Sequence, residues 1–318
     1  MALIIALLVV VIVTLLATTV SSHFLLSFRA VELQQRSQQA WAYLSFAEEV
    51  AMKLLANDQE EQARVDHLEE EWSVPFSYPA RNNDEVVQIE GQLFDLQGRL
   101  NINQLALPVP KDNRFNVHQQ RFIRLLQCLE GPSLDESEAI AITEAVVDWL
   151  DPDNLVTGHG GAETLFYTAQ QSPRRAGNRL MTAPSELLWV KGVTQGLFQA
   201  LEPHITVLPV ENGLLNINTA SVETLRSLNQ NGNLQPLSKA DGELFIEQRE
   251  EEAWTDLSIF EHGLMAGRGI DIEGIGVSSQ YFLLNAQVGL NGKEFGLSSV
   301  IQRKDNSLRI VARSQGGW

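Results

Sequence analysis

The hydrophobic pattern of the chain begins with an unbroken apolar run. Residues 2–20 are all Ala, Leu, Ile, Val or Thr, and the first Lys or Arg is Arg29. A helix of this length spans about 28 Å, which matches the hydrocarbon core of a bilayer. A cleaved signal peptide would have a basic start and a shorter apolar core, so the run predicts a membrane anchor over residues 1–22.

Helical spacing of apolar residues continues beyond the anchor. No glycine or proline occurs before Pro75, which predicts that the anchor helix extends to about residue 57. One face of this extension carries a stripe that is typical of a helix packed on another layer, made of Ala40, Leu44, Ala47, Ala51 and Leu54. The acidic run that follows, at residues 58–71, is interpreted as a solvated segment.

The rest of the chain changes between strand and helix periods. Alternation over residues 85–103, with Gly98 near its centre, predicts a β-hairpin, and residues 280–314 predict three strands with turns at 290–293 and 304–307. Residues 111–207 have a helical period instead, with Ser133 as the expected N-cap of one helix. Insertion of one domain into another explains this layout. The parts are then 23–110, an inserted helical domain at 111–207, and 208–318.

Composition and charge narrow the classes of function. The formal net charge of −17 repels phosphate backbones, which argues against a nucleic-acid partner. Cys128 is the only cysteine, so the chain has no internal disulfide, and its apolar neighbours predict a buried position. The sequence contains no serine-hydrolase elbow, no zinc-protease motif and no phosphate-binding loop, which lowers the odds of an enzyme.

Candidate chemistry gathers in one acidic loop, where Asp148, Asp151, Asp153 and Glu163 occur with glycines and a proline between them. Hard cations such as Ca²⁺ take about six to eight oxygen ligands, many of them carboxylates. The spacing is not that of an EF-hand, because Val156 stands where the invariant glycine belongs. The same residues also form good turns without a metal. The residues alone leave cation binding and simple solvation both open.

Two segments are similar to halves of helix-hairpin-helix modules, which in other proteins bind DNA backbones. They lie at residues 185–201, with Gly192 at the hairpin, and at residues 216–228. Lys191 is the only basic residue at the hairpin, whereas DNA contact requires neutralisation of phosphates. A packing role is therefore favoured over DNA binding.

Together these features resemble the minor pseudopilin K family of type II secretion. The resemblance covers almost the whole chain and rests on the uncharged start MALIIALLVV, the helix AWAYLSFAEEVAMKLL, FDLQGRLNIN, the acidic loop DWLDPDN, NRLMTAPSELLWVKGVT and LNINTASVETLRSL, in this order. It implies the α+β class and a type IV pilin-like fold, in which a long N-terminal helix packs on an antiparallel sheet, with a large inserted α-helical domain.

The resemblance also carries functional expectations. It implies a non-enzymatic protein with a single inner-membrane anchor and a periplasmic body. It implies calcium at the acidic loop, with Asp148, Asp151, Asp153 and Glu163 as ligands. The implied partners are the minor pseudopilins I and J, with the major pseudopilin G, the inner-membrane platform and secreted proteins as further candidates.

Two features differ from ordinary pilins. The basic prepilin leader is absent, so Met1 is either the first mature residue or a start methionine. Most pilins carry a glutamate at mature position 5, where this sequence has Ile5, as is the rule in the K family. The lost charge and the bulky inserted domain predict a place at the tip of the pseudopilus, where no subunit stacks above.

Two other functions remain as alternatives. One is a membrane-anchored DNA receptor of the competence type, which should have a basic binding face. The other is a calcium-dependent periplasmic hydrolase, which should show a nucleophile and a base close together in the fold.

Overall fold

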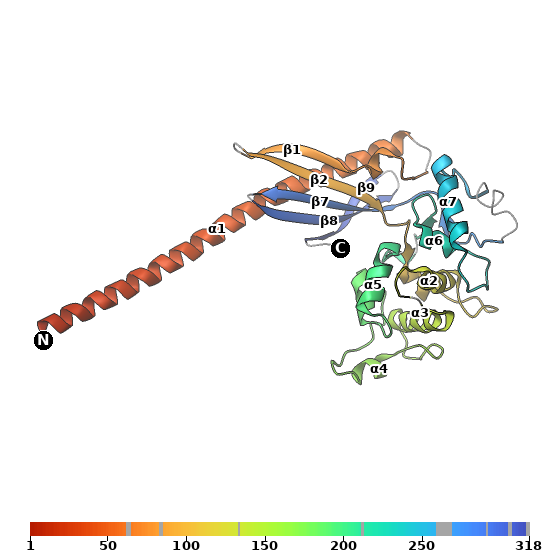
Figure 1. The fold of residues 1–318 in the computed structure, drawn as a ribbon, viewed down its shortest axis with the longest axis horizontal. Coiled ribbons are helices and arrows are strands. Elements are labelled where there is room, and N and C mark those ends of the chain that lie inside the picture. The colour runs from red at the N-terminus through yellow and green to blue at the C-terminus, as the bar shows by residue number, and fades with distance from the viewer. Residues whose placement is uncertain are drawn as a thin grey trace.

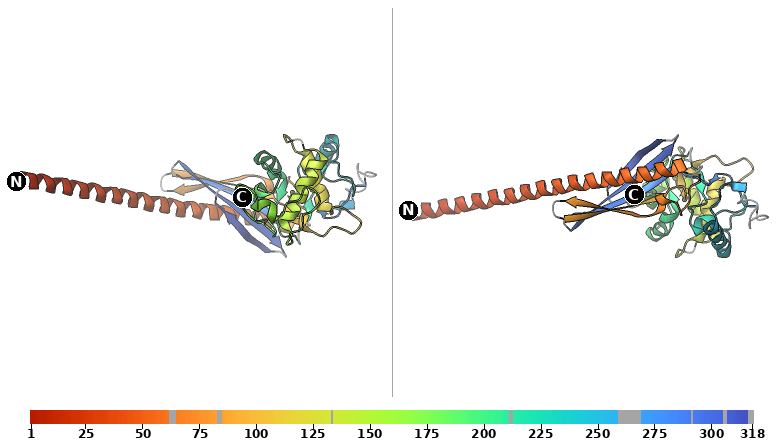
Figure 2. Two further views of the ribbon diagram at one scale, coloured as in Figure 1. Left: turned by 90° about the horizontal axis from the view of Figure 1, so that it is seen from below. Right: turned by 90° about the horizontal axis from the view of Figure 1, so that it is seen from above.

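A 60-residue helix dominates the N-terminal part of the molecule. The structure is a computed structural model that describes residues 1–61, 65–82, 85–132, 134–210, 213–258, 269–290, 292–304 and 307–315. Helix α1 (Ala2–Glu61) projects far from the rest of the chain, as Figures 1 and 2 show. Its first half is exposed, and among the described residues it is the one helix long and apolar enough to cross a membrane.

The C-terminal half of α1 packs on the sheet, as the apolar stripe predicted. Ala40, Leu44, Ala47 and Ala51 are buried in one core with residues of the sheet. Leu55 completes the stripe in place of Leu54, which is only half-buried. The helix ends about one turn later than predicted.

The sheet has five antiparallel strands in the order β1-β2-β7-β8-β9. The strands are β1 (Phe76–Asn82), β2 (Glu85–Asp95), β7 (Tyr281–Leu290), β8 (Lys293–Lys304) and β9 (Ser307–Ser314). A short 3-10 helix, η1 (Glu71–Ser73), leads into β1. The three C-terminal strands are confirmed, whereas the tips of the two predicted turns, at 291 and 305–306, lie outside the described residues. Long helix, sheet and helical portion together confirm the predicted fold class.

The predicted hairpin over residues 85–103 is wrong in its pairing. Strand β2 pairs with β1 and β7, whereas residues 100–101 form β3, which pairs in parallel with β4 (Ile205–Thr206). The chain leaves the sheet at Asp95, whose carboxylate accepts hydrogen bonds from Ser279 Oγ and Thr219 Oγ1 at 2.6 and 2.5 Å. Gly98 does not make a hairpin turn. A Cβ there would lie 2.6 Å from Thr219 Oγ1, so the glycine permits close packing.

A helical portion fills the chain between β2 and β7 (Figure 1). Its elements are β3 (Leu100–Asn101), η2 (Ile102–Ala106), α2 (Val117–Cys128), α3 (Glu136–Leu150), α4 (Thr164–Thr168), η3 (Pro184–Trp189), α5 (Gln195–Leu201), η4 (Glu202–His204), β4, β5 (Leu215–Asn216), α6 (Val222–Arg226), α7 (Lys239–Glu251) and β6 (Ile275–Gly276). Asp135 is the N-cap of α3, and the predicted cap Ser133 lies outside the described residues.

One hydrophobic core joins the helical portion from Leu100 to Ile275. The boundary predicted at residue 207 falls inside this core, because α6 packs on α2 and α7 packs on α6. Cys128 is buried in this part of the molecule, as its apolar neighbours predicted.

Two copies of the sequence Leu-Asn-Ile-Asn form equivalent clamps in the helical portion. Asn103 Nδ2 donates to the backbone oxygen of Met181 at 3.0 Å, and the backbone N–H of Met181 donates to Asn103 Oδ1 at 2.8 Å. Asn218 exchanges the same pair of bonds with Trp254, at 2.9 and 3.0 Å. Each copy also forms a two-residue parallel strand, β3 with β4 and β5 with β6. The echo in the sequence therefore marks a repeated structural unit.

Candidate metal centre

The acidic loop follows directly from the end of helix α3. Asp148 lies in the last turn of the helix and is fully buried, and Asp151 is its C-cap residue. Glu163 is buried at the N-cap position of α4, where its side chain caps nothing. Asp153 is exposed between them. The C-terminal end of α3 and the N-terminal end of α4 thus place these carboxylates close together.

The structure brings three of the four predicted ligands into one cluster, here called the loop cluster. Asp151, Asp153 and Glu163 each offer a carboxylate oxygen, and these atoms lie within 4.8 Å of one another. Asp148 stands beside them, with Oδ1 accepting a hydrogen bond from Thr157 N at 2.9 Å. This grouping confirms the proximity that the sequence suggested.

Several oxygen atoms at this loop are buried without a hydrogen-bond donor. They are Asp148 Oδ2, Asp151 Oδ1 and both carboxylate oxygens of Glu163. Buried polar atoms are almost always paired, so a group of unpaired acceptors calls for an explanation. Within the described chain, no Lys or Arg forms an ion pair with any of the four acidic residues. A hard divalent cation would supply the missing charge, and the all-oxygen donor set fits Ca²⁺.

The pKa values at the loop cluster show the strain of holding these charges together. Burial, together with the nearby charges of Asp153 and Asp148, raises the pKa of Asp151 to about 6. Burial also raises the pKa of Glu163, followed by the charges of Asp148 and Asp151. Burial raises the pKa of Asp148 as well. Each group therefore holds its negative charge at a free-energy cost that a cation would relieve.

Side chains outside the acidic residues fix the shape of the loop. Glu144 Oε2 accepts from the backbone N–H groups of His159 and Gly160, at 3.1 and 2.8 Å. Lys191 Nζ donates to the carbonyl oxygens of Gly160 and Gly161, at 2.9 and 3.2 Å. A Cβ on Gly161 would lie 2.3 Å from Asp148 Oδ2, so only glycine fits there.

Sequence reasoning missed Asn178 at this site. Its Nδ2 donates to the backbone oxygen of Asp153 at 2.5 Å, and its Oδ1 is buried without a partner. Its φ of 44° lies in the left-handed region, which asparagine tolerates better than most residues. An asparagine so far from the acidic residues in sequence gave no signal of its place at the loop. The amide oxygen is a further ligand type that Ca²⁺ accepts.

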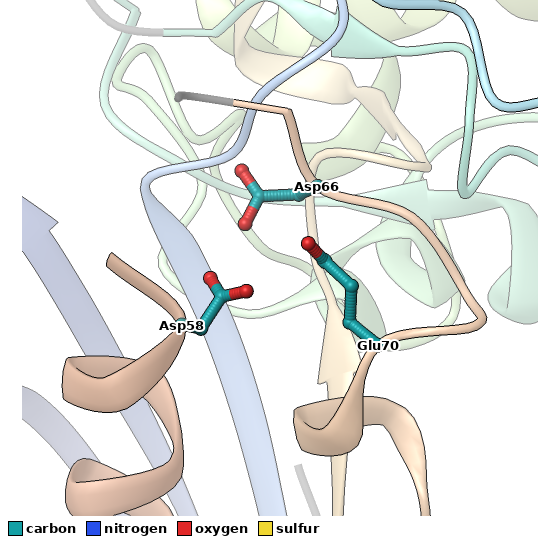
Figure 3. A group of neighbouring side chains, drawn as sticks. All are labelled: Asp58, Asp66 and Glu70. Atoms are coloured by element: carbon teal, nitrogen blue, oxygen red, sulfur yellow. The ribbon is translucent and has the colours of Figure 1, made fainter. Parts of the chain in front are cut away.

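A second acidic group contradicts the interpretation of residues 58–71 as solvated. Asp66 and Glu70 are buried, and their carboxylates gather with that of Asp58, again within 4.8 Å, at the end of α1. Figure 3 shows the three carboxyl groups turned toward one another. Arg303 of β8 pairs with Asp58 at 2.8 Å and also with Asp66. These three acidic residues are called the junction cluster below.

The helix-hairpin-helix-like segments contain no free basic face at the hairpin. Gly192 has a φ of 87° between η3 and α5, as expected of a hairpin glycine. Lys191 beside it is directed to the acidic loop, and its Nζ also lies 5.1 Å from the ring centre of Phe166. The one cation of the hairpin therefore serves the fold of the loop.

Comparisons with known proteins agree with the resemblance seen in the sequence. A family model described as type II secretion system protein K matches residues 98–210. The chain is 28% identical to type II secretion system protein K of Aeromonas hydrophila, covering 100% of this chain and 97% of the relative. It is 29% identical to protein K of Pseudomonas aeruginosa, covering 92% and 85%.

A solved structure has the same fold. It is a chain from the GspK–GspI–GspJ complex of the type 2 secretion system of enterotoxigenic Escherichia coli, with a TM-score of 0.77 and 27% identity. The match covers 90% of this chain and 99% of that chain, so it includes the sheet and the helical portion together. In both sequence and fold, the chain is therefore similar over nearly its whole length to protein K of type II secretion systems.

Proposed function

We propose that this protein is a minor pseudopilin that caps the tip of a periplasmic pseudopilus and binds the minor pseudopilins I and J. The observation that carries the proposal is the likeness to a chain of the GspK–GspI–GspJ complex, which extends over 90% of this chain. A partner set that is seen with a related chain of the same fold is the first one to test here.

The shape of the molecule supports a place at the tip. The helical portion lies at the end of the sheet opposite to the N-terminus of α1 (Figures 1 and 2). In a fibre whose subunits stack along their N-terminal helices, this bulk would occupy the space of the next subunit on that side. A terminal subunit has that space free.

Helix α1 supports an inner-membrane anchor with the body in the periplasm. Its apolar first part is exposed, whereas Ala40 to Leu55 pack on the sheet, so the two halves serve different environments. A bilayer or the apolar helices of neighbouring pseudopilins would cover the exposed part.

Calcium is proposed at the loop cluster, with Asp148, Asp151, Asp153 and Glu163 as ligands. Support comes from the unpaired buried oxygens and the absence of an ion-paired cation among the described residues there. The ion would hold the end of α3 and the start of α4 together, so its role is structural. A catalytic role is not proposed, and neither is DNA binding, because Lys191 is engaged with the loop.

The test uses the full chain in detergent, mixed with purified minor pseudopilins I and J. We expect one stable complex of all three on size exclusion, and a gold-labelled or fluorescent chain only at fibre ends. Omitting I or J, and replacing them by the major pseudopilin G, are the controls. Absence of any complex, or label spaced along the fibre, would overturn the tip assignment.

A further inference from the structure

The junction cluster contains a buried oxygen atom that the chain itself does not satisfy. Glu70 has a side chain that is only 5% exposed, and its Oε1 makes no hydrogen bond. The other oxygen, Oε2, accepts from Trp72 Nε1 at 2.6 Å and from His67 N at 2.9 Å. These two bonds fix the carboxylate, and Figure 3 shows that the carboxyl group of Glu70 points toward those of Asp58 and Asp66.

The charges of the junction cluster do not balance. Three carboxylates face one guanidinium, that of Arg303, whose two terminal nitrogens are used by Asp58 and Asp66. Glu70 receives no such contact, and His67 Nε2 lies 3.8 Å from Oε1, which is too far for a hydrogen bond. With all three acids ionised, the cluster carries a net charge of −2, which a divalent cation would neutralise.

The oxygen atoms are also held in place before any ligand arrives. Asp66 Oδ2 accepts from Ser279 N at 2.6 Å, and its backbone oxygen accepts from Asn216 Nδ2 at 3.0 Å. Asp58 Oδ2 is fixed by Arg303, which donates to it at 2.8 Å. Preorganised, partly dehydrated carboxylates are a good setting for a hard cation, because little has to move on binding.

We propose that Asp58, Asp66 and Glu70 form a second divalent-cation site, separate from the loop cluster, at the junction of α1, η1 and β8. Carboxylate oxygens without sulfur ligands select a hard ion of the Ca²⁺ class, with water completing its shell. The ion would tie the end of the long helix to the sheet through Arg303 and to the helical portion through Asn216.

The test measures ion binding by the detergent-solubilised full chain in which the loop cluster is disabled by Asp151→Asn and Asp153→Asn. Calorimetry with Ca²⁺ counts the remaining sites, and Tb³⁺ reports their place. Trp72 bonds directly to Glu70, so its indole should sensitise Tb³⁺ emission from the junction cluster. We expect about one bound ion per chain in this background.

Glu70→Gln is the decisive variant, with Glu69→Gln as the matched control. The amide introduced by Glu70→Gln keeps an oxygen for Trp72 and His67 but loses the charge, whereas Glu69 is an exposed neighbour. We expect Glu70→Gln to lower the affinity at least tenfold and Glu69→Gln to leave it unchanged. Asp58→Asn, at the other end of the cluster, should repeat the loss, and circular dichroism checks the fold.

Two results would overturn the proposal. One is the absence of any Ca²⁺ or Tb³⁺ binding in the background variant, which would mean that a proton alone neutralises Glu70. The other is equal affinity in Glu70→Gln, Asp58→Asn and Glu69→Gln, which would place the ion elsewhere. Neither result bears on the tip assignment or on the partners.

Discussion

The loop cluster and the junction cluster differ in how the chain compensates the charges of closely spaced carboxylates. Both gather three carboxylates within 4.8 Å of one another. The junction cluster receives a positive charge from the chain, because Arg303 reaches it from strand β8. The loop cluster receives no ion-paired cation from the described residues and keeps three buried oxygens unpaired, with a fourth on Asp148 beside it. The chain itself therefore supplies part of the countercharge at the junction cluster and, among the described residues, no ion-paired countercharge at the loop cluster.

This difference predicts which change should destabilise each cluster. Removing the guanidinium of a buried ion pair leaves uncompensated charge, which is more costly than never having had the pair. Removing a metal ion returns a cluster to a state that the fold already tolerates. The predictions below use this contrast, measured on the full chain in detergent.

The largest expected effect is that of Arg303→Met. Asp66 is 1% exposed and loses its guanidinium partner, so unfolding should become easier by about 4 kcal/mol. Guanidinium denaturation monitored by circular dichroism measures the change. Arg309→Met on the next strand is the control, because Arg309 is exposed and its Nε donates to the neutral Gln302 Oε1. Equal losses in the two variants would contradict the special role of Arg303.

Calcium should have the next largest effect, through the loop cluster. Ca²⁺ at about 100 times its dissociation constant should raise the free energy of unfolding by about 2.7 kcal/mol relative to chelator. Asp151→Asn combined with Asp153→Asn should abolish most of this gain, while Asp112→Asn, an exposed carboxylate of the helical portion, should keep it. Thermal melts with Ca²⁺ and with EDTA give the comparison. Identical melts of the parent protein would refute calcium binding.

The buried His118 should also make the stability of the protein depend on pH, independently of the two acidic clusters. Burial and the nearby charge of Arg121 lower the pKa of His118 to about 4, below the ordinary value of 6.5. As the pH falls, His118 is protonated in the unfolded chain before it is protonated in the folded one. Its contribution to the free energy of unfolding is therefore fully present above pH 6.5 and is lost as the pH falls toward 4. Between pH 7 and pH 5 the loss should be about 2 kcal/mol.

His118→Gln checks this prediction. The variant should lose less stability than the parent over the same pH range, when both are measured by denaturant titration in chelator. His159→Gln is the control, because His159 is exposed and only its backbone holds the loop. If the parent and His118→Gln have parallel pH profiles, the histidine does not titrate with folding.

The smallest expected effect comes from replacing one aspartate by asparagine at each cluster, and it should have opposite signs at the two clusters. In chelator, Asp148→Asn removes one of several repelling charges and should stabilise the protein by about 1 kcal/mol. Asp66→Asn removes a partner of Arg303 and should destabilise it. Denaturant midpoints of the two variants against the parent decide the matter. A loss of stability in both would mean that repulsion at the loop cluster is already screened.

The spacing of apolar and acidic residues was enough to predict the elements whose residues are close together in sequence. The apolar run and stripe predicted α1, and two-residue alternation predicted β7, β8 and β9. The loop cluster could be predicted because its acidic residues lie within sixteen positions of one another. Asn178 was missed because it reaches the loop from another segment, 25 residues away from Asp153.

Distant partners explain the failures. Asp66 was expected in solvent, but Arg303, which lies 237 positions away in sequence, provides the charge that permits its burial. The alternation over residues 85–103 was genuine, yet the partner of β3 lies at Ile205 instead of in β2. Neither pairing leaves a trace in the spacing of nearby residues, so periodicity cannot reveal it.

The two asparagine clamps have a consequence for the order of folding. The bond from Asn103 to Met181 closes a loop of 78 residues, and the bond from Asn218 to Trp254 closes one of 36. A loop about twice as long costs roughly 0.6 kcal/mol more chain entropy to close. The same motif, used twice, therefore encodes a sequence of events: the second clamp is expected to close first and to offer the first a partly formed core.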